Sequence, residues 1–579
     1  QNSTSRNRLT SALTLKYDFT DWLSLQAQVT RDGYIFDRTE IKPTGTHWLG
    51  DNGHLTQTKT DFHEINGNIV LEANKKFGLF SLHANFGGNT QDNIFTRGGI
   101  YGAGPFQVPY VYSVSNIKGE DRPYSYDYKH FRVNSLYASV DAGYKNFLFL
   151  TVTGRNDWYS TLNPKTNSYL YPSVSSAFVF SDAFKLPAWI TFGKLRAAIA
   201  KSSNGTEAYR NLLTYQVETY DINGRPIGNI TQTTIPNKFL KPVRITEQEA
   251  GLNLQFLNNR VGIDLAVYNK KTEDDILDVP ISSSTGYSAN ILNIGKLRNR
   301  GIELLLTGTP VKTRNFSWNS SFNIAFNNNK VLALTPPQNN PIPVSIDASP
   351  RYGNSVSIQH IVGLPYAQIV GYTYKRDPSG QIVYDTSGFA SRSDVLPVPL
   401  GSAIYKTTGG FSSELNYKNF TLSFLFDFKY GAKIYSNTNT AYYFFGQHIK
   451  TLEGRETGYI GKGVTEDGKT NTKSVASRDY FQNLIEGPGP TIAEEFVYDA
   501  SFIKFRSLSI GYSVPQALLK KGFIKGLTVS LVARNLATLM KHTPNIDPES
   551  NLNNTNAQGL ELAGYPPVRN MGLNVNVKF

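Results

Sequence analysis

The stretch Phe316–Phe326 reads FSWNSSFNIAF, and apolar and polar side chains alternate along it. In an extended strand, successive side chains point to opposite faces, so every second residue shares a face. One face then carries Phe316, Trp318, Ser320, Phe322, Ile324 and Phe326, and the other carries Ser317, Asn319, Ser321, Asn323 and Ala325. The stretch therefore predicts a β-strand with one apolar and one polar face.

The same period of two recurs in both directions from this stretch. It is found in Val261–Tyr268 and in Leu527–Arg534. In the last nine residues, Met571, Leu573, Val575, Val577 and Phe579 alternate with Gly572, Asn574, Asn576 and Lys578. Helical periodicity is nearly absent, and the chain is therefore predicted to be all-β.

The predicted connections alternate between short and long. Short turns are expected at 20–21, 75–76, 145–146, 185–186, 258–259, 311–312 and 418–419, and a longer one at 515–525. Long polar loops are expected at roughly 38–57, 94–128, 204–241, 276–289, 331–400, 437–496 and 540–564. Tight turns at one edge and long loops at the other are typical of outer-membrane proteins. The prediction is a transmembrane antiparallel up-and-down β-barrel with short periplasmic turns and long extracellular loops.

The strand count predicts that this chain does not close a barrel alone. About seventeen strands of membrane-spanning length are expected, whereas single-chain bacterial barrels have an even number. The first strand, around Arg8–Phe19, and the terminal strand then both run toward the short-turn side. Two such strands cannot pair antiparallel, so an odd number of strands is expected to lie outside residues 1–579.

The apolar face is expected to meet lipid. A barrel of about seventeen strands has a lumen too wide for side chains to fill, so its interior must be water-filled or plugged. Trp22, Trp189 and Trp318 follow tight turns, as interfacial aromatic residues do. The run Tyr442–Phe445 is read as part of the same girdle. Two alternatives stay open: a soluble extracellular β-rich glycan-binding protein or glycosidase, and a passive porin.

Composition excludes several classes of function. Lys and Arg number 58 and Asp and Glu 45, a net charge of +13, but no dense basic cluster points to nucleic acid. Cysteine is absent, which excludes disulfide scaffolds and thiolate metal sites. His63-Glu64 lacks the second histidine of a zinc protease, and neither a nucleophile elbow nor a P-loop is present. We therefore expect no catalytic residues, cofactor or metal: the protein is not predicted to be an enzyme.

Several segments resemble the SusC/RagA-type TonB-linked outer-membrane transporters of Bacteroidetes. They occur in order along nearly the whole chain: Arg132–Trp158, Tyr169–Ser175, Asn299–Glu303, Tyr498–Lys504, Ala533–Leu536, Asp547–Glu549 and Tyr565-Pro566 with the terminal strand. The resemblance implies a 22-stranded barrel with an N-terminal plug, located in the outer membrane. It also implies a SusD-like surface lipoprotein as a lid and energy supplied through TonB.

From this resemblance and the strand count, residues 1–579 are predicted to be the C-terminal part of the barrel. The plug and about five first strands are expected on another segment or chain, and TonB would act through that plug. The expected function is active import of a bulky nutrient, either a glycan or an oligopeptide.

Two sets of functional residues follow. The 94–128 loop is rich in aromatic rings suited to stacking on sugars or packing on the lid, although packing within the loop is the alternative. Its candidate contacts are Tyr101, Phe106, Tyr110, Tyr112, Tyr124 and Tyr126. The terminal Phe579, with Val577 and Val575 before it, is predicted to be the signal for membrane insertion, recognised by β-augmentation.

Overall fold

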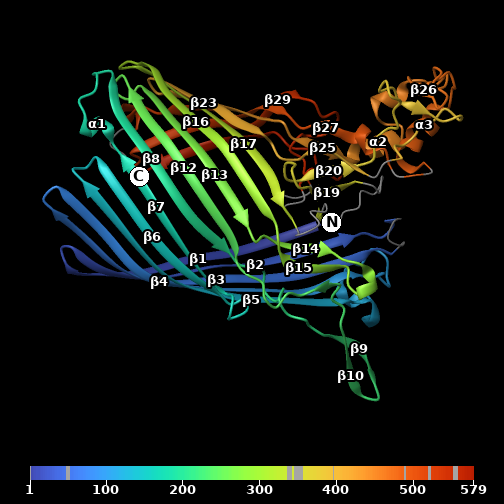
Figure 1. The fold of residues 1–579 in the computed structure, drawn as a ribbon, viewed down its shortest axis with the longest axis horizontal. Helices are drawn as coiled ribbons and strands as arrows, with labels where there is room; N and C mark the ends of the chain where they lie inside the picture. Colours follow the sequence, from blue (N-terminus) through green and yellow to red (C-terminus); the bar gives the residue numbers. More distant parts are fainter. Residues whose placement is uncertain are drawn as a thin grey trace. The chain divides into compact units, whose positions relative to one another are not determined.

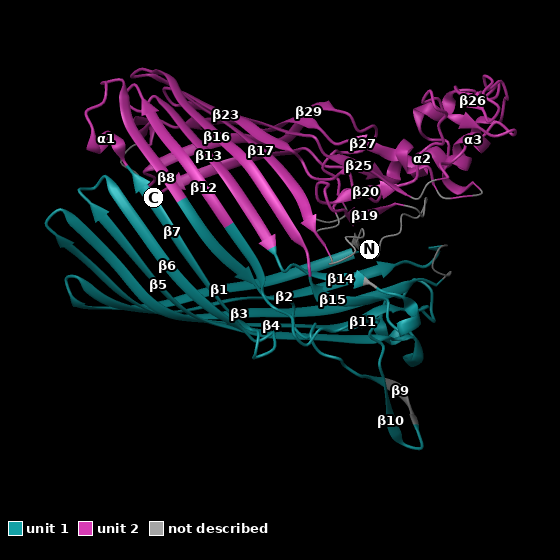
Figure 2. Cartoon of the chain, viewed as in Figure 1, with its two compact units in different colours: residues 1–178, 198–246, 273–293 teal, residues 179–197, 247–272, 294–579 magenta. Residues whose placement is uncertain are grey.

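The fold was examined in a computed structural model, which describes residues 2–46, 52–334, 342–344, 356–394, 397–487, 489, 491–519, 523–551 and 558–579. The chain forms two compact units, coloured separately in Figure 2. Unit 1 comprises residues 1–178, 198–246 and 273–293, and unit 2 comprises residues 179–197, 247–272 and 294–579. Each unit is described by itself below.

Seventeen strands belong to one sheet, in agreement with the predicted count (Figure 1). The first seven are β1 (Asn2–Thr20), β2 (Leu23–Lys42), β3 (His54–Phe77), β4 (Phe80–Ala103), β5 (Tyr124–Tyr144), β6 (Leu148–Tyr159) and β7 (Ser168–Phe178). The next five are β8 (Ile190–Asn204), β12 (Val243–Phe256), β13 (Val261–Glu273), β16 (Lys296–Lys312) and β17 (Phe316–Ala333). The last five are β23 (Thr407–Tyr417), β24 (Phe420–Tyr430), β28 (Phe502–Ser513), β29 (Gly526–Lys541) and β31 (Asn570–Lys578).

Strand pairing in unit 2 separates an apolar from a polar face. Because directly paired residues lie on the same side of a sheet, each row of partners reports one face. One row across six strands is wholly apolar: Trp318, Leu415, Leu422, Ile510, Leu531 and Leu573. A row on the opposite face is polar or small: Ser317, Asn416, Thr421, Gly511, Ser530 and Asn574.

The apolar face has little protein cover. Ile510 is 47 % exposed, Leu531 62 % and Leu573 64 %, which would be unfavourable in water. Toward the short turns this face becomes aromatic through Phe316, Tyr417, Phe420 and Tyr512. Such a row is an interfacial girdle, and the face is the lipid-facing surface of a barrel.

Four neighbouring strands of unit 1, β2 to β5, are longer than a membrane requires. β2 has 20 residues, β3 and β4 have 24 each, and β5 has 21. A tilted transmembrane strand needs about 9–11 residues. β2–β5 therefore extend well beyond the bilayer on their long-loop side.

The long-loop segments carry most of the remaining elements. Unit 1 has β9 (Gln216–Ile222), β10 (Arg225–Asn229), β11 (Thr234–Ile235), β14 (Ile276–Pro280) and β15 (Ala289–Asn293). Unit 2 has β18 (Ile342–Val344), β19 (Ser357–His360), β20 (Gln368–Gly371), β21 (Val383–Tyr384), β22 (Val398–Ser402), β25 (Lys433–Ser436), β26 (Val464–Thr465), β27 (Val497–Asp499) and β30 (Leu560–Glu561). The helices are α1 (Phe180–Ala183), in a short-turn connection, with α2 (Asn437–Phe444) and α3 (Ser477–Glu486) in a long loop.

The loops of unit 2 form a subdomain with a core of its own. That core includes Ile369, Tyr435, Tyr443, Phe481 and Phe496, all nearly or fully buried. The prediction that Tyr442–Phe445 belongs to a membrane girdle is wrong, because this run lies mainly in α2 and Tyr443 is 2 % exposed. The loop layer, not the barrel wall, holds the main buried core of unit 2.

Some predicted boundaries need correction. Both ends of the expected loop 94–128 are strand, since β4 continues to Ala103 and β5 begins at Tyr124. The turn expected at 75–76 lies at 78–79, and that expected at 311–312 lies at 313–315. Parts of the expected loops 38–57, 331–400, 437–496 and 540–564 lie outside the described residues.

The two end strands of the sheet each have one neighbour. Among the described residues, β1 pairs with β2 and β31 pairs with β29, and no pairing joins β1 to β31. This agrees with the direction argument from the strand count. In the same described residues, no helix is both long enough and apolar enough to traverse a bilayer.

Candidate functional site

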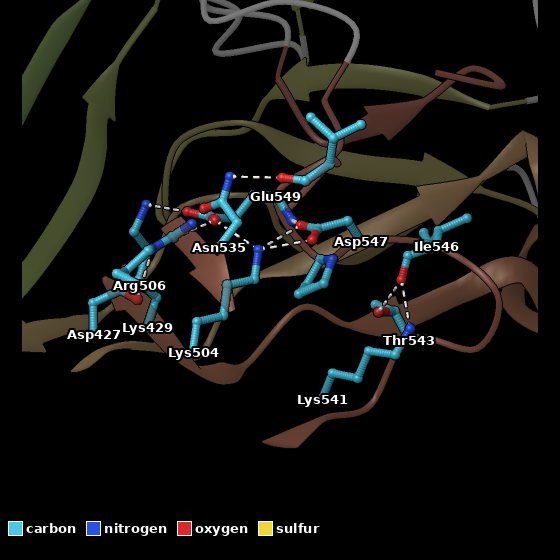
Figure 3. A network of polar contacts seen from close by, with 12 residues as sticks. Asp427, Lys429, Lys504, Arg506, Asn535, Lys541, Thr543, Ile546, Asp547 and Glu549 are labelled. Atoms are coloured by element: carbon cyan, nitrogen blue, oxygen red, sulfur yellow. Dashed lines mark hydrogen bonds and ion pairs between the residues drawn. The ribbon is translucent and has the colours of Figure 1, made fainter. Parts of the chain in front are cut away.

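A cluster of charged side chains lies where β24 and β28 of unit 2 meet the loop after β29 (Figure 3). Two of its cations, Lys504 and Arg506, lie at an irregularity in β28. Phe426 pairs with Phe505 but Leu425 pairs with Ser507, so Arg506 is an extra residue in the ladder. A β-bulge of this kind redirects a side chain, and here both Lys504 and Arg506 reach the carboxylate of Glu549.

The carboxylates come from the segment Asp547-Pro548-Glu549. The Asp547 side chain accepts a hydrogen bond from the backbone N–H of Glu549 at 2.8 Å, which fixes the turn. Lys504 Nζ lies 2.8 Å from Asp547 Oδ1 and 2.8 Å from Glu549 Oε2. Lys429 Nζ lies 2.9 Å from Glu549 Oε1, and Arg506 contacts both Glu549 and Asp427.

These groups are too buried to remain charged without partners. The Lys504 side chain is 9 % exposed and that of Asp547 is 10 % exposed. Burial alone would raise the pKa of the Glu549 carboxyl, but hydrogen bonds from Lys504, Arg506 and Lys429 lower it to about 2. Glu549 is therefore ionised at neutral pH and joins three cations from two strands.

The same segment is tied to the rest of unit 2. The Tyr405 hydroxyl donates to the backbone carbonyl of Pro548 at 3.2 Å. Lys541 Nζ and the Thr543 hydroxyl both donate to the carbonyl of Ile546, at 3.0 and 3.1 Å. Side-chain and backbone contacts thus hold the segment 541–549 to the barrel wall at its long-loop end.

Beside this cluster is a pocket of about 390 Å³. Lys504, Arg506, Asp547 and Glu549 contribute to its lining, together with Asn535 and Arg569. Donors and acceptors of both charge signs suit binding of a polar solute more than covalent chemistry. Across the described residues, no group of three or more His, Asp or Glu side chains is placed to hold a metal ion.

The six predicted aromatic contacts divide into two groups. Phe106 is fully buried and packs with Leu55, Ala103 and Ile117. The Tyr112 ring meets the Phe106 ring edge-on, with centroids 5.4 Å apart. These two residues form the core of the loop that follows β4, as the alternative of internal packing expects.

The other four are placed differently. The Tyr101 N–H donates to the Pro123 carbonyl at 3.1 Å, which joins the ends of the loop. Tyr110 is 73 % exposed, and its N–H donates to the Thr44 hydroxyl at 3.0 Å. Tyr124 and Tyr126 are on β5 and are 69 % and 63 % exposed. Contact of these residues with a ligand or a lid stays a prediction.

The predicted insertion signal lies on the lipid-facing row. Val575 and Val577 pair with Val529 and Leu527, and Phe579 follows in the same alternation. Phe579 is 64 % exposed, and its ring lies 4.6 Å from that of Phe523, centroid to centroid. Its role in membrane insertion stays a prediction.

Sequence reasoning missed the charged cluster as a site. Lys504, Asp547 and Glu549 all lie in segments that carry the family resemblance, but they were not named as candidates. One local signal was available: Lys504 and Arg506 are two cations at alternate positions, next to the apolar Phe502, Ile503 and Phe505. Their carboxylate partners lie more than 40 residues away, and only the fold brings them together.

Comparison with known proteins identifies the family. Residues 1–536 match the family described as TonB dependent receptor-like, beta-barrel. The TonB-dependent receptor P3 of Formosa agariphila is 25 % identical over 97 % of this chain and 57 % of its own length. The TonB-dependent receptor SusC of Bacteroides thetaiotaomicron is 24 % identical over 92 % of this chain and 52 % of its own length. The chain thus spans a little over half the length of these curated relatives.

A solved structure shows the same fold. The RagAB peptide transporter matches with a TM-score of 0.78 and 19 % identity, over 99 % of this chain and 62 % of the matched chain. The family match favours an outer-membrane barrel over the soluble β-protein considered as an alternative. The chain belongs to the TonB-dependent receptor β-barrel family, and it is an outer-membrane barrel of the SusC/RagA type.

Proposed function

We propose that this chain is the barrel portion of a TonB-dependent importer for a bulky nutrient, either a glycan or an oligopeptide. The proposal rests on one observation: the sheet of seventeen strands has an apolar face and a polar face. An apolar, exposed row faces lipid, while serine, threonine, asparagine and glycine line the opposite face. A polar interior of this width suits passage of a large hydrophilic solute.

The remainder of the transporter is part of the proposal. An unpaired strand edge in a bilayer exposes N–H and C=O groups at a cost of several kcal/mol each. β1 and β31 each have one described neighbour, so further strands must cover their outer edges. We assign that role to about five strands and a plug outside residues 1–579, through which TonB would act.

A SusD-like lipoprotein lid is proposed to contact the β9–β10 hairpin of unit 1, which projects away from the strands of that unit (Figure 1). Exposed apolar side chains include Leu212 (50 %) and Tyr215 (69 %) just before the hairpin and Ile222 (62 %) at the end of β9. At its root is a largely apolar pocket of about 630 Å³, lined in part by Leu162 and Leu212. A contiguous exposed apolar surface is typical of a site that a partner covers.

Uptake measurements test the transport proposal. Cells carrying the full-length protein should accumulate a fluorescent oligosaccharide or oligopeptide that cells lacking it do not. Removal of TonB should abolish this uptake, because an active importer needs energy from the inner membrane. Uptake that persists without TonB would instead indicate a passive porin.

The lid contact has a separate test. The double variant Leu212→Asp/Tyr215→Asp should reduce co-purification of the full-length protein with its SusD-like lipoprotein by about tenfold or more, as expected for lost interface anchors. Leu518→Asp is the matched control, since Leu518 is 69 % exposed in the connection between β28 and β29, on the short-turn side of unit 2. Unchanged co-purification of the double variant would show that the hairpin does not hold the lid.

A further inference from the structure

One face of β5 continues from the bilayer into the space outside it. Its even-numbered residues include Leu136 and Val140, which are 49 % and 43 % exposed. β5 pairs with β4 from Tyr144 to Tyr124 without a register shift. Tyr124, Tyr126 and Tyr128 therefore lie on the lipid-facing side of the sheet, not on its polar side.

The upper limit of the bilayer can be located on this face. From Tyr144 to Leu136 the even-numbered positions of β5 are apolar or aromatic. At a tilt of about 40°, these residues rise by about 21 Å, close to the apolar band of about 25 Å on such barrels. Beyond this band on the same face is Arg132, whose Nε donates to Asp92 Oδ2 at 2.7 Å. His130 Nε2 lies 2.8 Å from Asp92 Oδ1. This charged group marks the polar boundary.

The tyrosines lie above that boundary. Tyr128 is four residues beyond Arg132 and Tyr124 is eight residues beyond it. With the same tilt, they lie about 10 to 20 Å farther from the bilayer centre. A phospholipid headgroup layer is only about 5–8 Å thick on each side. A lipid with an oligosaccharide head is needed to reach this height.

The two outer rings are arranged for stacking. Tyr126 pairs with Gly98 of β4. A Cβ atom placed on Gly98 would lie 2.6 Å from the Tyr124 hydroxyl and 3.4 Å from Tyr126 Cδ2. Both side chains therefore lean over the bare glycine backbone. At 69 % and 63 % exposure, Tyr124 and Tyr126 leave much of their ring surface facing outward.

We propose that Tyr124 and Tyr126 bind the sugar headgroup of a glycolipid in the outer leaflet of the membrane. The site continues the lipid-facing surface of the same strand, at the height where such a headgroup lies. Aromatic faces stack on the C–H faces of sugar rings, and the tyrosine hydroxyls hydrogen-bond to sugar hydroxyls. This role goes beyond nutrient import and gives these two tyrosines a function on the outside of the barrel.

The test compares two probes on the full-length protein in lipid nanodiscs: lipopolysaccharide with a complete core oligosaccharide, and lipid A alone. The unaltered protein should bind the complete glycolipid about tenfold more tightly, as two stacked rings would provide. Tyr124→Ser/Tyr126→Ser should lose this preference while binding lipid A as before. Tyr124→Phe/Tyr126→Phe should keep most of it, because the rings remain.

Tyr110→Ser is the control, since Tyr110 is 73 % exposed at the same end of unit 1 but lies in the loop. It should bind both probes as the unaltered protein does. Equal affinity of the unaltered protein for the two probes would overturn the proposal, as would an undiminished preference in the double serine variant. A double serine variant that instead converts a dimer into monomers would identify the patch as a protein interface and also refute the glycolipid site.

Discussion

The barrel wall and the loop subdomain of unit 2 differ in where they place large apolar side chains: the wall leaves them exposed and the subdomain buries them. On β29 and β31, Leu531 and Leu573 are more than 60 % exposed. In the subdomain, Tyr435 and Phe496 are fully buried. The wall faces lipid, so it loses nothing by leaving leucine uncovered, whereas the subdomain faces water and must bury its rings. In these two regions of unit 2, the exposure of apolar residues therefore follows the solvent that surrounds them.

The largest expected effect tests the aqueous side of the comparison. Phe496→Ala should destabilise the subdomain by about 3–5 kcal/mol, because it leaves a cavity beside Tyr435 and Tyr443. Phe420→Ala, on the lipid-facing girdle, should change stability by less than about 1 kcal/mol. Hydrogen exchange of residues 432–487 should accelerate only in the first variant. Equal effects of the two substitutions would remove the distinction.

The next effect tests the lipid side. Leu573→Lys should destabilise the folded protein by about 2–4 kcal/mol, because it places a charge in the acyl layer. Asn574→Lys, one residue along on the opposite face, should be nearly neutral. Urea unfolding of the full-length protein in lipid vesicles measures both. A larger penalty for Asn574→Lys would reverse the assignment of the two faces.

A smaller effect concerns the contact between wall and loop. Glu549→Gln should cost about 1–3 kcal/mol at neutral pH, since Lys504, Arg506 and Lys429 lose their shared carboxylate. The pKa of Glu549 is lowered in the fold to about 2. Its ionisation therefore contributes stability above the unfolded pKa of about 4.5, and this contribution fades as pH falls toward 2.

Thermal unfolding at several pH values checks this account. The difference between the unaltered protein and Glu549→Gln should narrow as pH is lowered from about 5 to about 2, following the linkage of protonation to stability. Glu120→Gln is the matched control, because Glu120 lies 4.0 Å from Lys118 and both side chains are more than half exposed; its difference from the unaltered protein should stay near zero. A constant difference across this pH range would exclude ionisation of Glu549 as the cause.

The smallest effect on folded stability is expected at the C-terminus. Phe579→Asp should alter the free energy of unfolding by about 1 kcal/mol or less, since the side chain is 64 % exposed at the end of its strand. The surface level of the Phe579→Asp variant in cells should nevertheless fall strongly, because the terminal aromatic residue is the predicted insertion signal. Surface labelling and urea unfolding separate the two quantities. Normal surface levels would refute the signal.

The sequence predicts the wall well because its information is local. Alternation along Phe316–Phe326 and Met571–Phe579 fixes both the strand and its two faces without knowledge of any partner. The number of strands and the alternation of short and long connections follow from the same pattern. The alternation within strands, the number of strands and the alternation of short and long connections all agree with the structure.

The loop layer could not be predicted in the same way. Tyr443 joins a buried core by packing on Phe481 and Phe496, contacts that no local period reveals. Lys504 and Glu549 meet only through the fold and a bulge beside Arg506. The ends of β4 and β5 were expected to be loop, but Gly98 pairs with Tyr126 in the ladder, and tyrosines from the paired strand cover it.

Labelling of single cysteines tests the central claim most directly, because residues 1–579 contain no native cysteine. Fluorophores attached in turn at positions 573, 574, 575 and 576 of the full-length protein would be exposed to lipid-bound and water-soluble quenchers. We predict strict alternation: lipid-bound quenchers reach positions 573 and 575, and water-soluble quenchers reach 574 and 576. Quenching without alternation, or with the opposite phase, would contradict a wall whose apolar face meets lipid and whose polar face lines the lumen.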